Sequence, residues 1–277
     1  MSVIAATCVT LAATLASAQP GDTVTLSGKC GDISLPRRDN AKPITIDASD
    51  ARVRSLTIRG TAGWVWLGGT IDAPLPPEVW VNVFIDGSKR IEVAGATLTG
   101  GKTGVLVTRG SEDITLRGNV AIGLQSDGFN IATAKRVHLL GNTCTAFKPI
   151  PPVYDGARLV KDGTHPDCVQ IWSFPGQMTT SDINVIGNRI YGKMQGITNF
   201  GAAPPQNVRV MNNEVEVSYW HGIAMTNSPG SFVWNNVVRT IEGAKAPNYP
   251  YYNIKAGIRA DTQCGNVVDG DSVDGKC

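Results

Sequence analysis

Self-similarity along the chain is the feature that most restricts its fold. One family of segments reads ITLRGNV, VHLLGNT, INVIGNR, VRVMNNE and FVWNNVV. Its recurring asparagines are Asn119, Asn142, Asn188, Asn213 and Asn236. A second family alternates with the first and reads TGVLVT, DGFNIA, DCVQIW, QGITNF, HGIAMT and AGIRAD. Most steps are about 23–28 residues, a period that indicates a solenoid.

Each repeat unit contains two or three short alternating strands joined by tight turns, and one unit alone cannot bury an apolar face. Stacked units bury it, because each strand pairs with its counterpart one coil away at about 4.8 Å. The recurring asparagine suits a turn where side-chain amides hydrogen-bond along the stack. The sequence therefore predicts an all-β fold, a single-stranded right-handed parallel β-helix of roughly ten coils, as one domain over residues 1–277. A β-sandwich or propeller is the alternative, and both need hairpins between alternating strands.

The N-terminal segment SVIAATCVTLAATLASAQ has two interpretations. Its apolar run and its A-x-A-like end are typical of a signal peptide, but it has no basic n-region. We therefore expect residues 10–18 to form a short apolar helix that caps the open end of the stack and protects an exposed sheet edge. No later segment approaches the ~18 apolar residues that span a bilayer, so we expect no membrane partner.

Composition limits the partners and the compartment. Charged residues make up 17% of the chain and the formal net charge is +2, which argues against a nucleic-acid partner. The six cysteines show neither CxxC nor a zinc-type spacing. We expect disulfides to link the two ends and the middle of the chain, as Cys8–Cys30, Cys264–Cys277 and Cys144–Cys168. Spacing alone does not determine this pairing, but the even count favours a secreted or periplasmic protein.

Two insertions interrupt the repeat, and insertions build walls on an otherwise regular surface. The first, residues 148–165, makes the step between Gly128 and Cys168 about 16 residues longer than a regular coil. It carries Tyr154, Asp155, Arg158, Lys161, Asp162 and His165. The second insertion, residues 245–255, carries Tyr249, Tyr251 and Tyr252. This tyrosine loop suits stacking on sugar rings, and an ordinary surface loop stiffened by prolines is an equally good interpretation.

Alignment of the second family on its small residue predicts a polar surface beside the first insertion. The small residues are Gly104, Gly128, Cys168, Gly196, Gly222 and Gly257. The positions just before them are Thr103, Asp127, Asp167, Gln195, His221 and Ala256. Two positions after them, facing away from the core, are Leu106, Asn130, Gln170, Thr198, Ala224 and Arg259. Two carboxylates on adjacent coils should raise one pKa or bind a cation such as Ca²⁺, although an aspartate before glycine is also a common turn former.

The repeat resembles that of the right-handed β-helix superfamily of pectate lyases, polygalacturonases, alginate epimerases and phage depolymerases, over nearly the whole chain. The segment AATLASAQPGDTVTLSG also resembles the cap helix and first strand of these proteins. DGFNIAT and TGVLVTRG resemble alginate epimerase coils. This resemblance implies the fold, and fold alone does not determine the reaction.

Four local motifs resemble polygalacturonases. QSDGFNI resembles the N-T-D-G segment and implies a catalytic role for Asp127, and HGIAM resembles the G-H-G segment and carries over His221. PDCVQI resembles D-D-C, with Asp167 retained and Pro166 in place of the other aspartate. GIRAD resembles R-I-K through Arg259, with an aspartate in place of the lysine. An inverting hydrolase needs a protonated and an ionised carboxyl, and one expected aspartate is missing.

The favoured hypothesis is a polysaccharide lyase that acts on a uronic-acid glycan by β-elimination. The reaction needs a base, a group that neutralises the sugar carboxylate and a proton donor. The candidate bases are Lys161 and His165, and the candidate proton donors are Tyr154 and His165. The candidates for the carboxylate are Arg158, Arg259 and a Ca²⁺ ion held by Asp127 and Asp167.

Other interpretations use the same surface. A C5 epimerase needs nearly the same groups as the lyase. A glycoside hydrolase would use Asp127 and Asp167 as its carboxyl pair, with His221 and Arg259 in the sugar subsite. A non-catalytic glycan-binding β-helix needs none of them to react. In the lyase we expect the substrate-binding residues to be Arg158, Gln170, Asn130, His221 and Arg259. We expect no required cofactor and either a monomer or a homotrimer.

Overall fold

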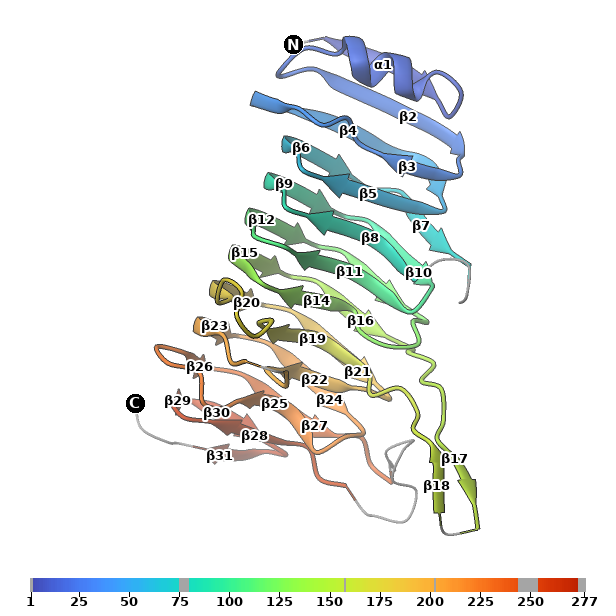
Figure 1. Cartoon of the computed structure of the whole chain (residues 1–277). Helices are drawn as coiled ribbons and strands as arrows, with labels where there is room; N and C mark the ends of the chain where they lie inside the picture. The colour runs from blue at the N-terminus through green and yellow to red at the C-terminus, as the bar shows by residue number, and fades with distance from the viewer. Residues whose placement is uncertain (1, 75–79, 157, 202, 244–253, 274–277) are drawn as a thin grey trace.

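The computed structural model describes residues 2–74, 80–156, 158–201, 203–243 and 254–273. The chain winds into a right-handed parallel β-helix of about ten coils, as the repeat predicts (Figure 1). Each regular coil contributes one strand to each of three faces. The short helix α1 (Leu11–Ser17) lies at the N-terminal end of the stack, with Leu11 and Leu15 buried. It is the predicted cap.

Face one is a nine-stranded parallel sheet. Its strands, in spatial order, are β3 (Asp32–Ser34), β5 (Ser55–Arg59), β8 (Val81–Asp86), β11 (Thr103–Thr108), β14 (Phe129–Ala132), β19 (Asp167–Trp172), β22 (Gln195–Thr198), β25 (His221–Met225) and β28 (Gly257–Ala260). The inward residues pair from coil to coil as Val105, Phe129, Val169, Ile197 and Ile223, and all five are buried. Each follows the small residue of the second sequence family by one position.

Faces two and three belong to one continuous sheet, because the long strand β4 (Asp39–Val53) pairs with both β6 and β7. Face two continues through β6 (Ala62–Leu67), β9 (Lys89–Ala94), β12 (Ser111–Arg117), β15 (Ala134–Leu140), β20 (Ser181–Ile186), β23 (Gln206–Met211), β26 (Phe232–Trp234) and β29 (Gln263–Cys264). Face three contains β7 (Thr70–Ala73), β10 (Thr97–Gly100), β13 (Val120–Ile122), β16 (Thr143–Thr145), β21 (Arg189–Gly192), β24 (Glu214–Val217), β27 (Val237–Thr240) and β30 (Asn266–Val268).

The ends of the chain complete this sheet. Strand β1 (Val3–Thr7) pairs with β2 (Thr23–Lys29), which in turn pairs with β4. At the other end β31 (Asp271–Val273) turns back antiparallel to β30. Within the described ranges no helix is long and apolar enough to cross a membrane.

The recurring asparagines form a continuous ladder at the corner between faces two and three. In each step the backbone N–H and the side-chain Nδ2 of one asparagine donate to Oδ1 of the next; for Asn188 and Asn213 both distances are 2.9 Å. Nδ2 of Asn188 also donates to the carbonyl of Leu139 at 3.0 Å. The ladder has one member that the sequence analysis did not include, Asn266, which accepts from Asn236. All six asparagines are buried.

Asn188→Ala is expected to destabilise the protein by about 3 kcal/mol or more, because it leaves buried donors of Asn142 without an acceptor. Thermal or urea unfolding followed by circular dichroism measures the loss. The matched variant is Asn266→Ala at the last rung. It also removes the acceptor of the preceding asparagine, but Nδ2 of Asn236 keeps the carbonyl of Trp234 and no later asparagine loses a donor, so this variant should cost less. Equal destabilisation by the two variants would contradict the expected difference between an internal and a terminal asparagine of the ladder.

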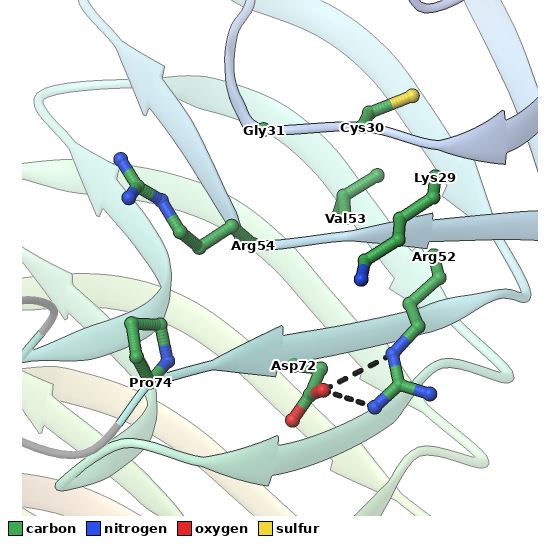
Figure 2. A pocket seen from close by; sticks show the side chains of 8 residues that line it. All are labelled: Lys29, Cys30, Gly31, Arg52, Val53, Arg54, Asp72 and Pro74. Atoms are coloured by element: carbon green, nitrogen blue, oxygen red, sulfur yellow. Dashed lines mark hydrogen bonds and ion pairs between the residues drawn. The ribbon is translucent and has the colours of Figure 1, made fainter.

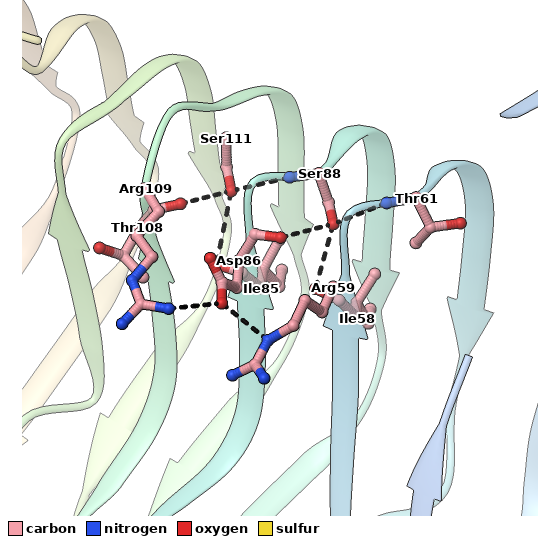
Figure 3. A network of polar contacts seen from close by, with 9 residues as sticks. All are labelled: Ile58, Arg59, Thr61, Ile85, Asp86, Ser88, Thr108, Arg109 and Ser111. Atoms are coloured by element: carbon pink, nitrogen blue, oxygen red, sulfur yellow. Dashed lines mark hydrogen bonds and ion pairs between the residues drawn. The ribbon is translucent and has the colours of Figure 1, made fainter. Parts of the chain in front are cut away.

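A second hydrogen-bonded line runs along the corner between faces one and two (Figure 3). The backbone N–H of Thr61 donates to Oγ of Ser88, and the N–H of Ser88 donates to Oγ of Ser111, each at 3.3 Å. Beside it, the buried carboxylate of Asp86 accepts from Arg59 Nε at 2.8 Å and from Arg109 Nη1 at 3.1 Å. These hydroxyl and ion-pair contacts join the coils of β5, β8 and β11, the last of which also carries Asn119, the first asparagine of the ladder.

The small residue of the second sequence family has a packing cause. At Gly128 an added Cβ would lie 2.7 Å from Sγ of Cys144, and at Gly196 it would lie 1.9 Å from the carbonyl of Gly222. These positions point into a narrow corner of the coil. Cys168 occupies the same position and is disulfide-bonded to Cys144, with both cysteines fully buried.

Two of the predicted disulfides are confirmed. Cys8–Cys30 ties the capping segment to the first coil and Cys144–Cys168 lies in the middle of the core. Cys264 is disulfide-bonded as well, and its predicted partner, Cys277, lies outside the described residues.

The first insertion forms an antiparallel hairpin, β17 (Val153–Asp155) and β18 (Arg158–Lys161). Figure 1 shows this hairpin extending beyond the stack, well separated from β14 and β19. The second insertion, residues 245–255, lies almost entirely outside the described residues, and its three tyrosines are among those left out.

Candidate functional site

The outward side chains of face one form two neighbouring lines across the C-terminal coils. The central column contains Asn130, Gln170, Thr198, Ala224 and Arg259, which pair in this order from strand to strand. The edge column contains Asp127, two residues before β14, and Asp167, Gln195 and His221, the first residues of β19, β22 and β25. Seven of the ten predicted site residues lie in or next to these columns: Asp127, Asp167, Asn130, Gln170, His221, Arg259 and, two residues before Asp167, His165. The other three lie on the hairpin of β17 and β18.

Asp127 and Asp167 lie on adjacent coils and are held by a dense set of hydrogen bonds. The backbone N–H of Asp167 donates to Oδ1 of Asp127 at 3.3 Å, and Nδ2 of Asn130 donates to Oδ2 of Asp127 at 2.8 Å. The hydroxyl of Thr198 donates to Oδ1 of Asp167 at 2.8 Å. The amide of Asn130 also donates to Oε1 of Gln170 at 2.7 Å. The pair is thus fixed by the central column beside it.

Both carboxyls are nearly inaccessible, with 7% of Asp127 and 2% of Asp167 exposed. Burial raises the pKa of Asp127, and burial together with the charge of Asp127 raises the pKa of Asp167 well above its usual range. The ammonium of Lys102, which the sequence analysis did not single out, partly opposes the rise at Asp127. The expectation that paired carboxylates raise a pKa therefore holds here, with desolvation as the larger cause.

Asp167→Asn is expected to raise the melting temperature at neutral pH. Because the folded-state pKa of Asp167 is raised, the native protein holds this proton more tightly than the unfolded chain. The stabilisation is therefore complete near pH 4 and is lost as the pH rises through the raised pKa. Asparagine cannot ionise and keeps an oxygen for Thr198. Each kcal/mol regained should raise the melting temperature by about 2–4 °C.

Differential scanning fluorimetry from pH 4 to pH 8 measures this effect. The difference between variant and wild type should grow with pH. Asp271→Asn, which removes an exposed carboxylate, is the control and should show no such trend. A variant that is less stable than wild type at every pH would show that the Asp167 carboxylate itself stabilises the fold.

His221 and Arg259 lie at the C-terminal end of the same surface, on β25 and β28. His221 is half-buried and Arg259 is exposed. Burial, and to a smaller extent the positive charge of Arg259, lowers the pKa of His221. The imidazole is therefore neutral at neutral pH and available as a base, next to a cation. The ring of Phe200 packs edge-on against His221 with the centroids 4.7 Å apart.

Exposed aromatic side chains flank the columns, and the sequence analysis did not identify them. Trp172 donates from its indole to Oδ1 of Asn130 at 2.9 Å and packs on Phe174 with the centroids 4.4 Å apart. Phe174, Phe200 and Trp220 are each more than a third exposed. The turns that carry Phe174 and Phe200 are paired through Ser173 and Ala203. Phe174 and Phe200 lie two residues after β19 and β22, and Trp220 lies directly before β25.

The hairpin residues lie apart from this surface. The side chains of Tyr154, Arg158 and Lys161 are exposed on β17 and β18, on a hairpin that extends beyond the stack. Nε2 of His165 lies 3.2 Å from the carboxylate of Asp162, on the hairpin's return to the stack. The convergence of hairpin and columns that the sequence suggested is therefore limited to His165.

The oxygens around the carboxyl pair do not fit a Ca²⁺ ion as they stand. Ca²⁺ takes six to eight oxygen ligands, whereas Oδ1 of Asn130 accepts from Trp172 and Oε1 of Gln170 accepts from Asn130. Within the described ranges no three His, Cys, Asp or Glu side chains are grouped for a metal. The raised pKa values also favour protonated carboxyls over ligands. Binding of Ca²⁺ by Asp127 and Asp167 stays a prediction.

A basic groove lies at the N-terminal corner between face three and face one (Figure 2). It has a volume of about 580 Å³ and is lined by Lys29, Arg52 and Arg54, with Asp72 paired to Arg52. Arg54 is paired to Asp32 on its other side. This groove adds positive charge to the stack several coils away from the carboxyl pair.

A second groove, about 470 Å³, connects that corner to face one. It shares Arg54 with the first groove and is lined by the exposed Trp80, by Phe84 and by Leu106. Leu106 pairs directly with Asn130 of the central column. The outward surface of face one is therefore continuous from the basic N-terminal corner to Arg259.

Comparison with known proteins finds similarity only at the level of structure. No protein-family model and no curated protein matches the sequence. An alginate lyase from Paenibacillus sp. str. FPU-7 aligns with a TM-score of 0.52 and 17% identity, over 96% of this chain and 95% of the lyase. Pectate lyase Pel9A aligns with a TM-score of 0.56 and 12% identity, over 96% of this chain and 79% of that one. The chain shares their parallel β-helix fold.

A third structure with this fold is ORF18 of Geobacillus virus E2, with a TM-score of 0.50 and 9% identity, over 95% of this chain and 59% of that one. At these identities the similarity establishes the architecture alone. The predicted resemblance to the β-helix superfamily is confirmed at that level.

Proposed function

We propose that this protein degrades an acidic, uronic-acid-containing polysaccharide by β-elimination on the outward surface of face one. The observation that carries the proposal is the placement of His221, whose pKa is lowered, beside the exposed Arg259 at the end of a polar column flanked by aromatics. The polysaccharide lyases among the similar structures support it. The disulfides are in keeping with the secreted or periplasmic location expected from the sequence.

The surface offers a group for each step of the elimination. Arg259 neutralises the uronate carboxylate and so stabilises the charge that develops when the C5 proton leaves. The neutral imidazole of His221 accepts that proton. The electron pair forms the C4–C5 double bond and the glycosidic C4–O4 bond breaks. The imidazolium created in the first step supplies the proton for the leaving oxygen. Gln170 keeps a second Nε2 hydrogen for a sugar hydroxyl, and the second lone pairs of Asn130 Oδ1 and Gln170 Oε1 can accept from others.

This assignment moves the base from the hairpin to the column. Lys161 and Tyr154 were expected to act as base and acid, but both are exposed on a hairpin that extends away from face one. His165 lies at the foot of the hairpin and remains a candidate proton donor. A C5 epimerase would use the same His221 and Arg259, with the proton returned to the opposite face of the sugar.

Glycoside hydrolysis is the second candidate, and the carboxyl pair favours it. Raised pKa values for Asp127 and Asp167 are what a shared proton requires, and an inverting hydrolase uses one protonated and one ionised carboxyl. Against it, at most 7% of either residue is exposed, so neither carboxyl reaches a sugar without movement of the surrounding side chains. A positioning role for the pair, beneath Asn130 and Gln170, agrees better with its burial.

A product assay over a panel of polysaccharides tests the proposal. Alginate, polygalacturonate and hyaluronan are incubated with the protein, each with EDTA and with added CaCl₂. Ultraviolet absorbance from an unsaturated uronate is the expected result. New reducing ends without that absorbance would support the hydrolase, and a changed monomer ratio without cleavage would support the epimerase. Binding without any of these would leave the non-catalytic glycan-binding β-helix. Full activity in EDTA would exclude a required Ca²⁺.

A further inference from the structure

A polar pocket of about 450 Å³ lies on face two, on a different side of the coil from the columns. Strands β12, β15, β20 and β23 form its floor. Its lining includes Asp113, Arg136, His138, Asp182, Asn184 and Arg209. None of these residues belongs to the surface proposed for catalysis. The pocket is therefore a separate feature of the molecule.

The histidine in this pocket is held in one tautomer. Nδ2 of Asn184 lies 2.9 Å from Nδ1 of His138, and since an amide nitrogen can only donate, Nδ1 is the acceptor. In the neutral ring the proton is then on Nε2. His138 and Asn184 lie opposite each other on the adjacent strands β15 and β20. Two of their polar atoms, Nε2 of His138 and Oδ1 of Asn184, have no hydrogen-bond partner among the described residues.

Some charged side chains of the pocket are paired with other described residues, and one is not. The guanidinium of Arg136 is occupied by Asp113 and Glu112. The carboxylate of Asp182 accepts from Nδ2 of Asn207 at 3.2 Å. Arg209 is exposed, and no hydrogen bond or ion pair joins its guanidinium to another described residue. Two aspartates and two arginines line the pocket, so their formal charges cancel. The pocket thus presents mixed donors and acceptors without net charge.

An aromatic surface continues this row of side chains. Arg209 pairs across strands with Phe232, whose ring contacts Trp234 with the centroids 5.9 Å apart. Trp234 is 41% exposed. It pairs with Met211, which is partly exposed on the same face. Face two therefore offers a flat apolar patch directly beside uncommitted hydrogen-bonding groups.

We propose that face two carries a second carbohydrate-binding site, which holds a polysaccharide chain away from the catalytic surface. A pyranose ring has an apolar C–H face that packs on an aromatic ring and hydroxyls that both donate and accept. Trp234 and Phe232 receive the C–H face, while Arg209, His138 Nε2 and Asn184 Oδ1 bind hydroxyls. Because the charges of the pocket cancel, hydrogen bonds to hydroxyls rather than net electrostatic attraction provide the polar part of the binding. That the chain bound is the substrate of face one rests on the proposed function.

Affinity electrophoresis in gels that contain alginate, polygalacturonate or neutral dextran tests the site. Wild type should be retarded by at least one polymer, and Arg209→Ala and Trp234→Ala should each weaken the apparent affinity about tenfold or more. The matched control is Arg189→Ala, which removes an exposed arginine from face three and should leave retardation unchanged. Circular dichroism and melting temperature confirm that each variant is folded.

Activity separates this site from the catalytic proposal. Arg209→Ala and Trp234→Ala should turn over short oligosaccharides as wild type does and lose rate only on long polymer. If wild type forms no unsaturated product but Arg209-dependent retardation persists, the proposed function fails and the site stands. The site is overturned if both variants are retarded as wild type is, or if Arg189→Ala loses retardation equally.

Discussion

Replacement of His221 with alanine is expected to lower kcat about 10²–10⁴-fold, the range for loss of a general base. The imidazole is only half-buried and forms no hydrogen bond to another residue in the part of the chain that the structure describes, so the variant should fold normally. The rate of formation of unsaturated product from the active polysaccharide measures the loss. Lys161→Ala and His165→Ala are the matched variants, because they remove the bases first suggested by the sequence.

The pH profile gives this prediction a second readout. A catalytic base must be deprotonated, so kcat should rise with pH through the His221 pKa and level off above it. Because burial and Arg259 lower that pKa, the rise should lie below the ordinary histidine value of 6.5. Arg259→Ala should shift the rise towards higher pH and increase KM. Full activity of His221→Ala, with loss in Lys161→Ala instead, would return the base to the hairpin.

Removal of the central disulfide is expected to cause the largest loss of stability. Cys144 and Cys168 are 24 residues apart in sequence, and the chain-entropy model gives about 3.5 kcal/mol for a loop of this size. At about 2–4 °C per kcal/mol, the variant Cys144→Ala/Cys168→Ala should melt about 7–14 °C lower than wild type. Scanning calorimetry measures the shift. The disulfide also closes the base of the hairpin insertion, so β19 should lose protection with it.

The terminal disulfide provides the comparison. Cys8–Cys30 closes a loop of similar size, with a separation of 22 residues, but it joins the cap to the first coil. In a solenoid each coil contacts only its neighbours. Cys8→Ala/Cys30→Ala should therefore loosen the capped end and move the main transition much less. An equal shift in both variants would show that the stack unfolds as one unit from its N-terminal end.

The sequence predicts the fold well because the fold is periodic. The asparagine spacing gives the coil length, and alternation within segments such as DCVQIW separates inward Val169 from outward Gln170. The small residue at Gly128 or Gly196 reflects a contact with the adjacent coil, which repeats with the same period. Local rules of this kind need no knowledge of distant parts of the chain.

The candidate site is less predictable because its surroundings are irregular. Alternation places Gln170 outward, but the position of the buried Asp167 at the first residue of β19 depends on the irregular segment before the strand, which follows no period. The exposed aromatic residues beside the columns were not predicted for the same reason, because Phe174 and Phe200 lie in turns between strands. Lys161 and Tyr154 suggested catalytic groups on the first insertion. β17 and β18 instead pair with each other, and the hairpin extends beyond the stack. Spacing along the chain does not report that direction.

The asparagine ladder divides the rod into two mechanical parts. It begins at Asn119 and ends at Asn266, so it spans the coils that carry the carboxyl pair and His221, while the coils before it rely on hydroxyls and ion pairs. Every amide in the ladder points the same way, and each rung is locked by the next. Backbone amides of the C-terminal coils should therefore exchange with deuterium more slowly than those of β5 and β8. The proposed catalytic surface rests on the stiffer half, so loosening of the N-terminal coils leaves its geometry intact.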